Sequence, residues 1–190
     1  MKIAIVLNSP NIIDKVFEDS IIYVDGGYNN KKYLEGKKTL AVVGDFDTLK
    51  DIPSDEKIIK LKKEKDFTDG ERAVYLAKEL KASEVSIYGA TGGRIEHILG
   101  NIALLKLCAC LSLKAKIIEK DCEIILCCGK QNLDIKKGTT ISIIPYTDDC
   151  IVLESKGLYY PLNNLTLTKG DTRGISNYNT EDKVYINIEK

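Results

Sequence analysis

Six short apolar runs in the first two thirds of the chain constrain its fold more than any other feature. Several of them are unbroken, which is typical of strands buried on both faces of a parallel sheet covered by helices. We therefore expect an α/β fold here. The runs are residues 2–7, 21–24, 40–43, 57–61, 85–88 and 115–118.

Two segments between these runs have the spacing of amphipathic helices. Thr68-Asp-Gly-Glu71 has the form of a capping box, and apolar residues then recur at helical spacing, which predicts a helix starting near Asp69. A second helix is expected just after Gly92-Gly93, where Ile95, Ile98, Leu99, Ile102 and Leu105 form another apolar stripe.

The pattern changes near residue 120. Helical periodicity stops, and short segments rich in β-branched residues follow, separated by turn formers. We expect a Rossmann-like α/β domain over residues 1–120 and an antiparallel β-sandwich over 121–190. The segments expected to form strands in the second domain are 123–128, 139–144, 151–154, 158–160, 165–168 and 183–188.

Charge and cysteine content exclude several classes of protein. The chain has 28 basic and 28 acidic residues, so a protein that binds nucleic acid by bulk phosphate neutralisation is not expected. The apolar start, Lys2 to Leu7, is too short for a signal peptide or a membrane span. The six cysteines have no zinc-site spacing, so we expect reduced, mostly buried thiols in a cytoplasmic protein.

Residues with a common chemistry follow four of the expected strands. Ligands in open α/β sheets bind at the carboxyl ends of the strands, so these residues are the candidates for a site. Three of the strand ends carry aspartates, and the fourth carries glycines followed by an arginine. The four segments are Asp25-Gly26-Gly27, Gly44-Asp45-Phe46-Asp47-Thr48, Lys65-Asp66-Phe67-Thr68-Asp69 and Gly89-Ala90-Thr91-Gly92-Gly93-Arg94.

Aspartates gathered at one edge of a sheet repel one another unless a cation lies among them. In a continuing strand Asp45 and Asp47 would face the same side, and Asp69 could complete an all-oxygen shell suited to Mg²⁺. Glycine pairs next to helix starts let phosphate oxygens approach backbone N–H groups. A structural role stays open for each pattern alone: Asp25-Gly-Gly27 also fits a turn, and Thr68-Asp69 a helix cap.

Five short segments together resemble the thiamine pyrophosphokinase family, in order and approximate spacing. They are Val24-Asp-Gly-Gly27, Gly44-Asp-Phe-Asp-Thr48, Lys65-Asp-Phe-Thr-Asp69, Gly92-Gly-Arg-Ile-Glu-His97 and Gly174-Ile-Ser-Asn177. The resemblance implies an enzyme that transfers pyrophosphate from ATP to the hydroxyethyl group of thiamine and releases AMP. It also implies a homodimer with active sites at the subunit interface.

Carried over to this sequence, the resemblance implies three groups of site residues. Asp45, Asp47 and Asp69 are the expected catalytic magnesium ligands, and Ser176 and Asn177 are the expected thiamine contacts. The residues expected to bind the nucleotide are Asp25, Gly26, Gly27, Lys65, Asp66, Thr91, Gly92, Gly93, Arg94 and His97.

The chain departs from the family pattern at two places. Glu96 stands where the family usually has aspartate, and the chain has no tryptophan to stack on thiamine, for which Tyr178 is a substitute. Two other functions stay open. A non-catalytic thiamine or nucleotide sensor would keep the glycine loops. A phosphatase using Asp45-Phe-Asp47 as its nucleophile motif would need Thr or Val where the chain has Leu49.

Overall fold

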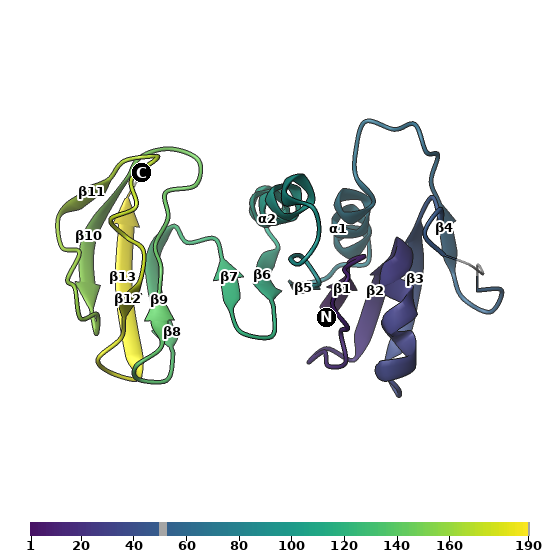
Figure 1. Ribbon diagram of the computed structural model, residues 1–190, viewed down its shortest axis with the longest axis horizontal. Helices are drawn as coiled ribbons and strands as arrows, with labels where there is room; N and C mark the ends of the chain where they lie inside the picture. The colour runs from purple at the N-terminus through teal and green to yellow at the C-terminus, as the bar shows by residue number, and fades with distance from the viewer. Residues whose placement is uncertain (50–52, 190) are drawn as a thin grey trace. The chain divides into compact units, whose positions relative to one another are not determined.

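A computed structural model describes residues 1–49 and 53–189. The first part is built on a seven-stranded sheet with the order β4-β3-β2-β1-β5-β6-β7 (Figure 1). Strands β1 to β6 are parallel, and β7 pairs antiparallel with β6. The strands are β1 (Lys2–Val6), β2 (Ser20–Val24), β3 (Lys38–Gly44), β4 (Ile58–Lys60), β5 (Glu84–Tyr88), β6 (Lys114–Ile118) and β7 (Glu123–Ile125).

Two α-helices cover one face of this sheet, and a 3-10 helix covers the other. Helices α1 (Asp69–Glu79) and α2 (Ile95–Cys110) pack their buried residues against Ile3, Ile5 and Ile87 of the central strands. The helix η1 (Asp25–Tyr33) runs directly into Leu34, which packs on the opposite face with Val6 and Tyr23. Both faces of the central strands are therefore buried, as their unbroken apolar runs predict.

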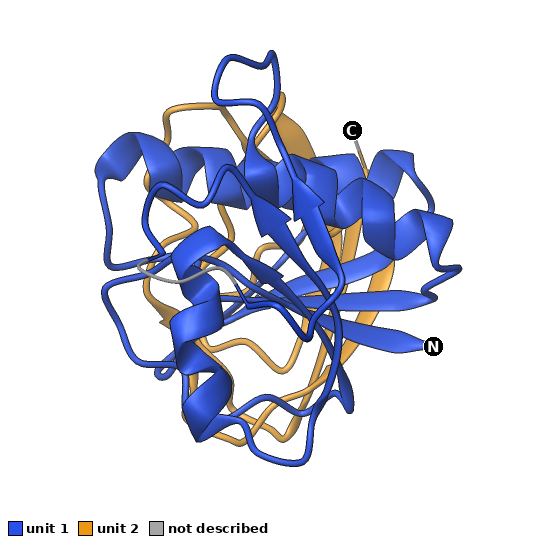
Figure 2. Cartoon of the chain, turned by 90° about the vertical axis from the view of Figure 1, so that its right-hand side faces the viewer, with its two compact units in different colours: residues 1–126 blue, residues 127–190 orange. Residues whose placement is uncertain are grey.

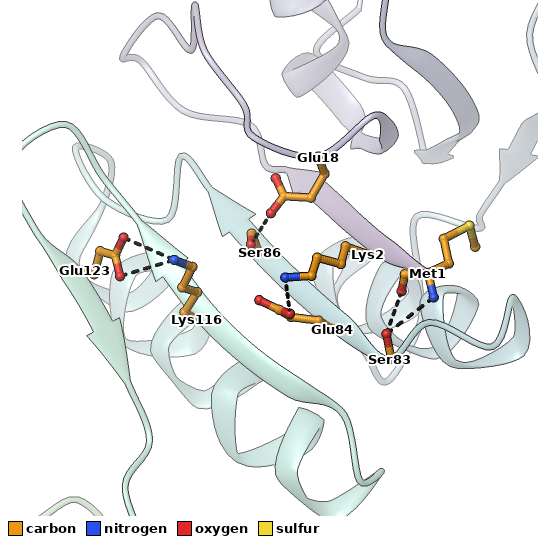
Figure 3. A network of polar contacts seen from close by, with 8 residues as sticks. All are labelled: Met1, Lys2, Glu18, Ser83, Glu84, Ser86, Lys116 and Glu123. Atoms are coloured by element: carbon orange, nitrogen blue, oxygen red, sulfur yellow. Dashed lines mark hydrogen bonds and ion pairs between the residues drawn. The ribbon is translucent and has the colours of Figure 1, made fainter. Parts of the chain in front are cut away.

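A buried carboxylate fixes the loop between β1 and β2 to the middle of the sheet. Glu18 is only 7% exposed, and its two carboxylate oxygens accept hydrogen bonds from Ser86 Oγ and Tyr88 Oη of β5. Figure 3 shows Glu18 directed at Ser86, with the Lys2–Glu84 ion pair beside it. Burial raises the pKa of the Tyr88 hydroxyl well above its ordinary value, and the hydrogen bond to the Glu18 carboxylate raises it too.

The chain divides into two compact units, Met1–Leu126 and Cys127–Lys190, coloured blue and orange in Figure 2. The second unit has a four-stranded antiparallel sheet, β11-β10-β13-β8, and a two-stranded sheet, β12-β9. Ile141 of β9 packs against the core under the larger sheet, so both sheets share one core. The strands are β8 (Gly129–Asp134), β9 (Thr140–Ile141), β10 (Cys150–Lys156), β11 (Leu165–Leu167), β12 (Asn177–Tyr178) and β13 (Lys183–Glu189).

All six apolar runs of the first part form strands, and both expected helices are present, which confirms the α/β fold class. Other expectations were wrong. Residues 123–125 pair with β6 and belong to the first unit, whereas we placed them in the second domain. The segment 158–160 makes only an isolated bridge, Leu158 to Asn179.

The cysteines are less buried than expected. All six are free, but only Cys108 is buried, while Cys110, Cys122 and Cys128 are exposed. The exposed thiols lie at the last residue of α2 and on either side of β7.

Candidate active site

The carboxyl ends of β1, β2 and β3 are joined by the hydroxyl of Thr48. Its Oγ1 accepts a hydrogen bond from the backbone N–H of Gly26 at 3.0 Å and lies 3.5 Å from the side-chain amide of Asn8. The Gly26 N–H therefore donates its hydrogen bond within the protein, whereas the sequence led us to expect that it would donate to a phosphate oxygen. Gly27 is needed for space, because a Cβ there would lie 2.3 Å from the carbonyl oxygen of Val6.

Asp25 begins η1 and turns its carboxylate toward the end of β3. Its Oδ1 accepts a hydrogen bond from the backbone N–H of Phe46 at 3.1 Å. Burial raises the pKa of Asp25 to about 7; the hydrogen bond from Phe46 lowers the pKa, and the negative charges of Asp69 and Asp45 raise it again. Asp25 thus shares the site with the two other carboxylates, whose negative charges add to the larger effect of burial on its pKa.

The segment after β3 is a turn, so our expectation that Asp45 and Asp47 lie on one side of a continuing strand was wrong. The strand ends at Gly44, and Phe46 has a φ of 66° although its side chain is buried. Oδ1 of Asp45 accepts a hydrogen bond from the backbone N–H of Asp47. The turn leaves Asp45 mostly covered, while the carboxylate of Asp47 is half exposed and lies 3.6 Å from Lys63 Nζ.

Lys65 brings together two of the predicted metal ligands. Its ammonium nitrogen lies 3.0 Å from Oδ1 of Asp69 and 3.9 Å from Oδ2 of Asp45, and all three side chains are less than one-fifth exposed. Asp69 is placed by the first turn of α1, whose N-terminus is capped by Thr68 Oγ1 accepting from the N–H of Glu71. The capping that we expected from Thr68 is confirmed, and it leaves the Asp69 carboxylate free to face the site.

The donor chemistry fits a hard divalent cation. Oδ1 of Asp69 is enclosed and accepts no hydrogen bond, and its partner in the structure is a positive charge, the Lys65 ammonium, so the position is one that a cation stabilises. Carboxylate oxygens are the ligands that Mg²⁺ prefers. Across residues 1–49 and 53–189, however, no three acidic, histidine or cysteine side chains stand close enough to form a metal cluster as they are arranged. Asp45 and Asp69 are the best-placed pair, and Asp47 lies at the edge.

The loop after β5 ends at the N-terminus of α2. The N–H groups of the first turn have no side-chain cap at Arg94, unlike those of α1, and such groups can bind an anion. The loop is held by neighbouring segments: Ser9 Oγ donates to the Thr91 carbonyl oxygen, and the Thr91 N–H donates to Glu119. Gly92 and Gly93 are exposed. The loop is therefore fixed at its base and open at its tip.

Four of the residues that the sequence singled out have exposed side chains: three were expected to bind the nucleotide, and the fourth is Glu96. Arg94 pairs with Glu96, and both side chains are more than half exposed. The pKa of Glu96 is below its ordinary value because of its own backbone N–H and the Arg94 guanidinium. Asp66 and His97 are also exposed. Within the described residues, Asp69 forms its ion pair with Lys65 and with none of these four side chains.

Ser176 and Asn177 lie in the second unit, and only one of them presents its side chain to solvent. Ser176 is exposed and has a φ of 60°. Asn177 is 4% exposed, and its side-chain amide bonds to both the N–H and the carbonyl of Tyr160. Beside them Tyr159 and Tyr178 stack with ring centroids 4.5 Å apart, and Tyr160 meets Tyr159 edge-on.

Sequence reasoning missed the residues that follow β1. Asn8, Ser9 and Asn11 lie beside Thr48 and the Thr91 loop, and a Cβ on Gly92 would meet the Asn11 amide at 2.5 Å. The rule that ligands bind at strand ends would have identified them, since Asn8 directly follows the first apolar run. The same rule would have identified Glu119, which fixes Thr91, because Glu119 directly follows the apolar run 115–118.

Comparison with known proteins shows similarity along most of the chain. Residues 14–119 match the family described as thiamin pyrophosphokinase, catalytic domain, and residues 129–190 match thiamin pyrophosphokinase, vitamin B1 binding domain. The thiamine pyrophosphokinase of Bacillus subtilis is 39% identical over 117 residues, which cover 60% of this chain and 54% of that protein. The match thus spans about half the length of this curated relative.

Solved structures extend the similarity to the whole fold. The crystal structure of thiamine pyrophosphokinase from Bacillus subtilis has a TM-score of 0.88 and 28% identity, covering all of this chain and 95% of that one. Thiamin pyrophosphokinase from Candida albicans has a TM-score of 0.79 at 18% identity, covering 99% and 86%, and shows a shared fold. Within the described residues, no helix has the length and apolarity needed to span a bilayer.

Proposed function

The chain belongs to the thiamin pyrophosphokinase family, and we propose that it transfers the terminal pyrophosphate of ATP to the hydroxyethyl group of thiamine, giving thiamine diphosphate and AMP. One observation in the structure carries this proposal best. Asp25, Asp45 and Asp69 converge with Lys65 at the carboxyl edge of the sheet, and the uncapped N-terminus of α2 follows another strand, β5, at its carboxyl end. Such an edge suits a ligand that brings both phosphate and a divalent cation.

Asp45 and Asp69 would hold a magnesium ion, with Asp47 at the outer edge of the same group. The ion would neutralise the charge that grows on the phosphate oxygens during transfer. The protein itself fixes the geometry: Asp25 ties η1 to the turn after β3, and Thr48 joins that turn to the end of β1. The uncapped N–H groups of α2 would donate to phosphate oxygens.

For thiamine, the proposed surface is on the second unit. Ser176 presents its hydroxyl, while Asn177 shapes the surface by holding the backbone of Tyr160. Tyr159, Tyr160 and Tyr178 expose aromatic rings that can pack against a heteroaromatic ligand.

We also propose a homodimer with active sites at the subunit interface, in the cytoplasm. Ile95 and Leu99, one turn apart on α2, are 71% and 61% exposed. A partner subunit would cover this exposed apolar pair. The six free cysteines suit a reducing compartment. Light scattering on the purified protein, with Leu99→Glu as the variant, tests the dimer: a dimeric wild type and a monomeric variant are expected, and a monomeric wild type would contradict it.

The experiment that tests the activity is incubation of the protein with thiamine, ATP and MgCl₂, followed by product analysis. Equal amounts of AMP and thiamine diphosphate are expected. Phosphate release without thiamine would indicate a phosphatase, and binding without turnover a sensor. Asp45→Asn and Asp69→Asn should each lower turnover about 100-fold or more. Asp19→Asn is the control, because Asp19 lies fully exposed before β2.

A further inference from the structure

Lys65 is the most enclosed lysine of an otherwise exposed, lysine-rich loop. Lys62, Lys63 and Glu64 before it are exposed, whereas the Lys65 side chain is 11% exposed. Its ammonium donates to the carbonyl oxygen of Lys62 at 3.1 Å and lies against Asp69 and Asp45. Drawing a lysine out of water is costly, so the carboxylates must attract it strongly.

The position of this ammonium is the position that a metal ion would need. A magnesium ion binds carboxylate oxygens at about 2 Å, and Oδ1 of Asp69 already has the Lys65 nitrogen 3.0 Å away. A divalent ion and an ammonium cannot both contact this oxygen without strong repulsion, because like charges a few ångströms apart repel strongly where little water separates them.

We propose that Lys65 and the divalent cation compete for Asp69 and Asp45, so that binding of the metal releases the Lys65 side chain toward the phosphate chain of the nucleotide. The inference rests on the proposed function, since it takes these aspartates as metal ligands. Lys65 is then a stand-in cation that keeps the carboxylates from repelling one another, and a phosphate ligand once it is displaced.

An open hollow is available to receive the displaced side chain. It has a volume of about 820 Å³ and is lined by Asp45, Asp47 and residues 60–64. Lys60, Lys62 and Lys63 are on its wall, and all are exposed. The Lys65 ammonium already contacts the backbone of this loop at Lys62, so in the proposed displacement it turns from the two carboxylates toward the three lysines, whose charges offset those of Asp45, Asp47 and Glu64 on the same wall.

Metal binding without nucleotide tests the competition. We expect Lys65→Met to bind Mn²⁺ about tenfold or more tightly than the wild type, by calorimetry or electron paramagnetic resonance, because the competing charge is gone. Lys2→Met is the matched control, since Lys2 at the start of β1 pairs with Glu84 at the start of β5, at the opposite end of these strands from their carboxyl ends. Its Mn²⁺ affinity should equal that of the wild type.

A second measurement on the wild type avoids any doubt about folding of the variant. Acetylation of Lys65, followed by mass spectrometry, should rise several-fold when Mn²⁺ is added, while acetylation of Lys2 stays constant. If the wild type binds Mn²⁺ but Lys65→Met binds no more tightly, or Lys65 stays equally protected, the competition is wrong and the metal site stands. If neither protein binds Mn²⁺, the assignment of the metal ligands fails as well.

Discussion

Oδ1 of Asp25 accepts a hydrogen bond from the backbone N–H of Phe46, and the space for this carboxylate exists because residue 44 has no side chain. A Cβ on Gly44 would lie 1.8 Å from the same Oδ1. The contact joins the end of β2 to the turn that carries Asp45 and Asp47. The position of the proposed metal ligands therefore depends on Gly44, which has no functional group of its own.

Gly44→Ala should displace Asp25 and with it the turn at Phe46. We expect turnover to fall about 100-fold, because small displacements of positioning groups are costly for transfer reactions. Product analysis of the purified variant checks the fall, and circular dichroism checks that the sheet persists. Activity within twofold of the wild type would show that Asp25 does not position the turn.

Gly100 is the control glycine for Gly44, and Gly100→Ala should stabilise the protein. Gly100 lies in the interior of α2, and a Cβ there would meet no atom within 4 Å. Alanine is favoured over glycine in helix interiors by about 0.5–1 kcal/mol, so the free energy of unfolding should rise by that amount. Urea unfolding measures it, and a lower value would mean that Gly100 itself packs against the partner subunit in the proposed dimer.

The buried pair Glu18 and Tyr88 should show a measurable coupling. Tyr88 Oη donates to Glu18 at 2.8 Å, and it also accepts from the N–H of Phe17 at 3.1 Å. We expect Tyr88→Phe to cost about 1–3 kcal/mol, because buried partners are left without a hydrogen bond. In a double-mutant cycle with Glu18→Gln, the coupling should be about 1 kcal/mol or more. Additive losses would show that the two side chains stabilise the fold independently.

The strands of a parallel sheet could be predicted, although not their order, because each central strand is buried on both faces and is therefore apolar without interruption. The same reasoning misses β8 and η1. Strand β8 contains Lys130, Gln131 and Asn132, and it is ordered by pairing with β13 along its whole length. Helix η1 contains Gly26 and Gly27, which lower helical propensity, and its backbone is fixed by contacts with the ends of β1 and β3.

Within the site, residue types could be predicted but their arrangement could not. Aspartates at strand ends are visible in the sequence, whereas the positive φ of Phe46, an aromatic residue, is not. It accompanies burial of the ring in a cluster with Val42, Tyr88 and their neighbours, and it lies between Asp45 and Asp47. The grouping of Asp45 and Asp69 around Lys65 likewise depends on contacts between distant parts of the chain.

Two cysteines on α2 should differ sharply in reactivity. Burial raises the pKa of the Cys108 thiol to about 11, while Cys110, two residues later, is exposed. Since the thiolate reacts and a raised pKa keeps the thiol protonated, Cys108 should stay unmodified by a disulfide reagent at pH 8 while Cys110 reacts. The same shift makes folding less favourable as the pH rises above 9, where the unfolded thiol loses its proton first. Mass spectrometry of the labelled protein identifies the modified residue, and equal labelling would show that α2 opens readily.

Tyr178 offers the sharpest test of the proposed thiamine surface. Its ring stacks on Tyr159 at an interplanar angle of 19°, and its backbone N–H donates to the side chain of the buried Asn177. If thiamine packs against this aromatic surface, Tyr178→Ala should raise the KM for thiamine about tenfold. The KM for ATP should stay unchanged, because the nucleotide residues lie in the other unit. Tyr178→Phe keeps the ring and should behave like the wild type, so a loss in the phenylalanine variant would assign the role to the hydroxyl, and an unchanged KM in the alanine variant would remove Tyr178 from the site.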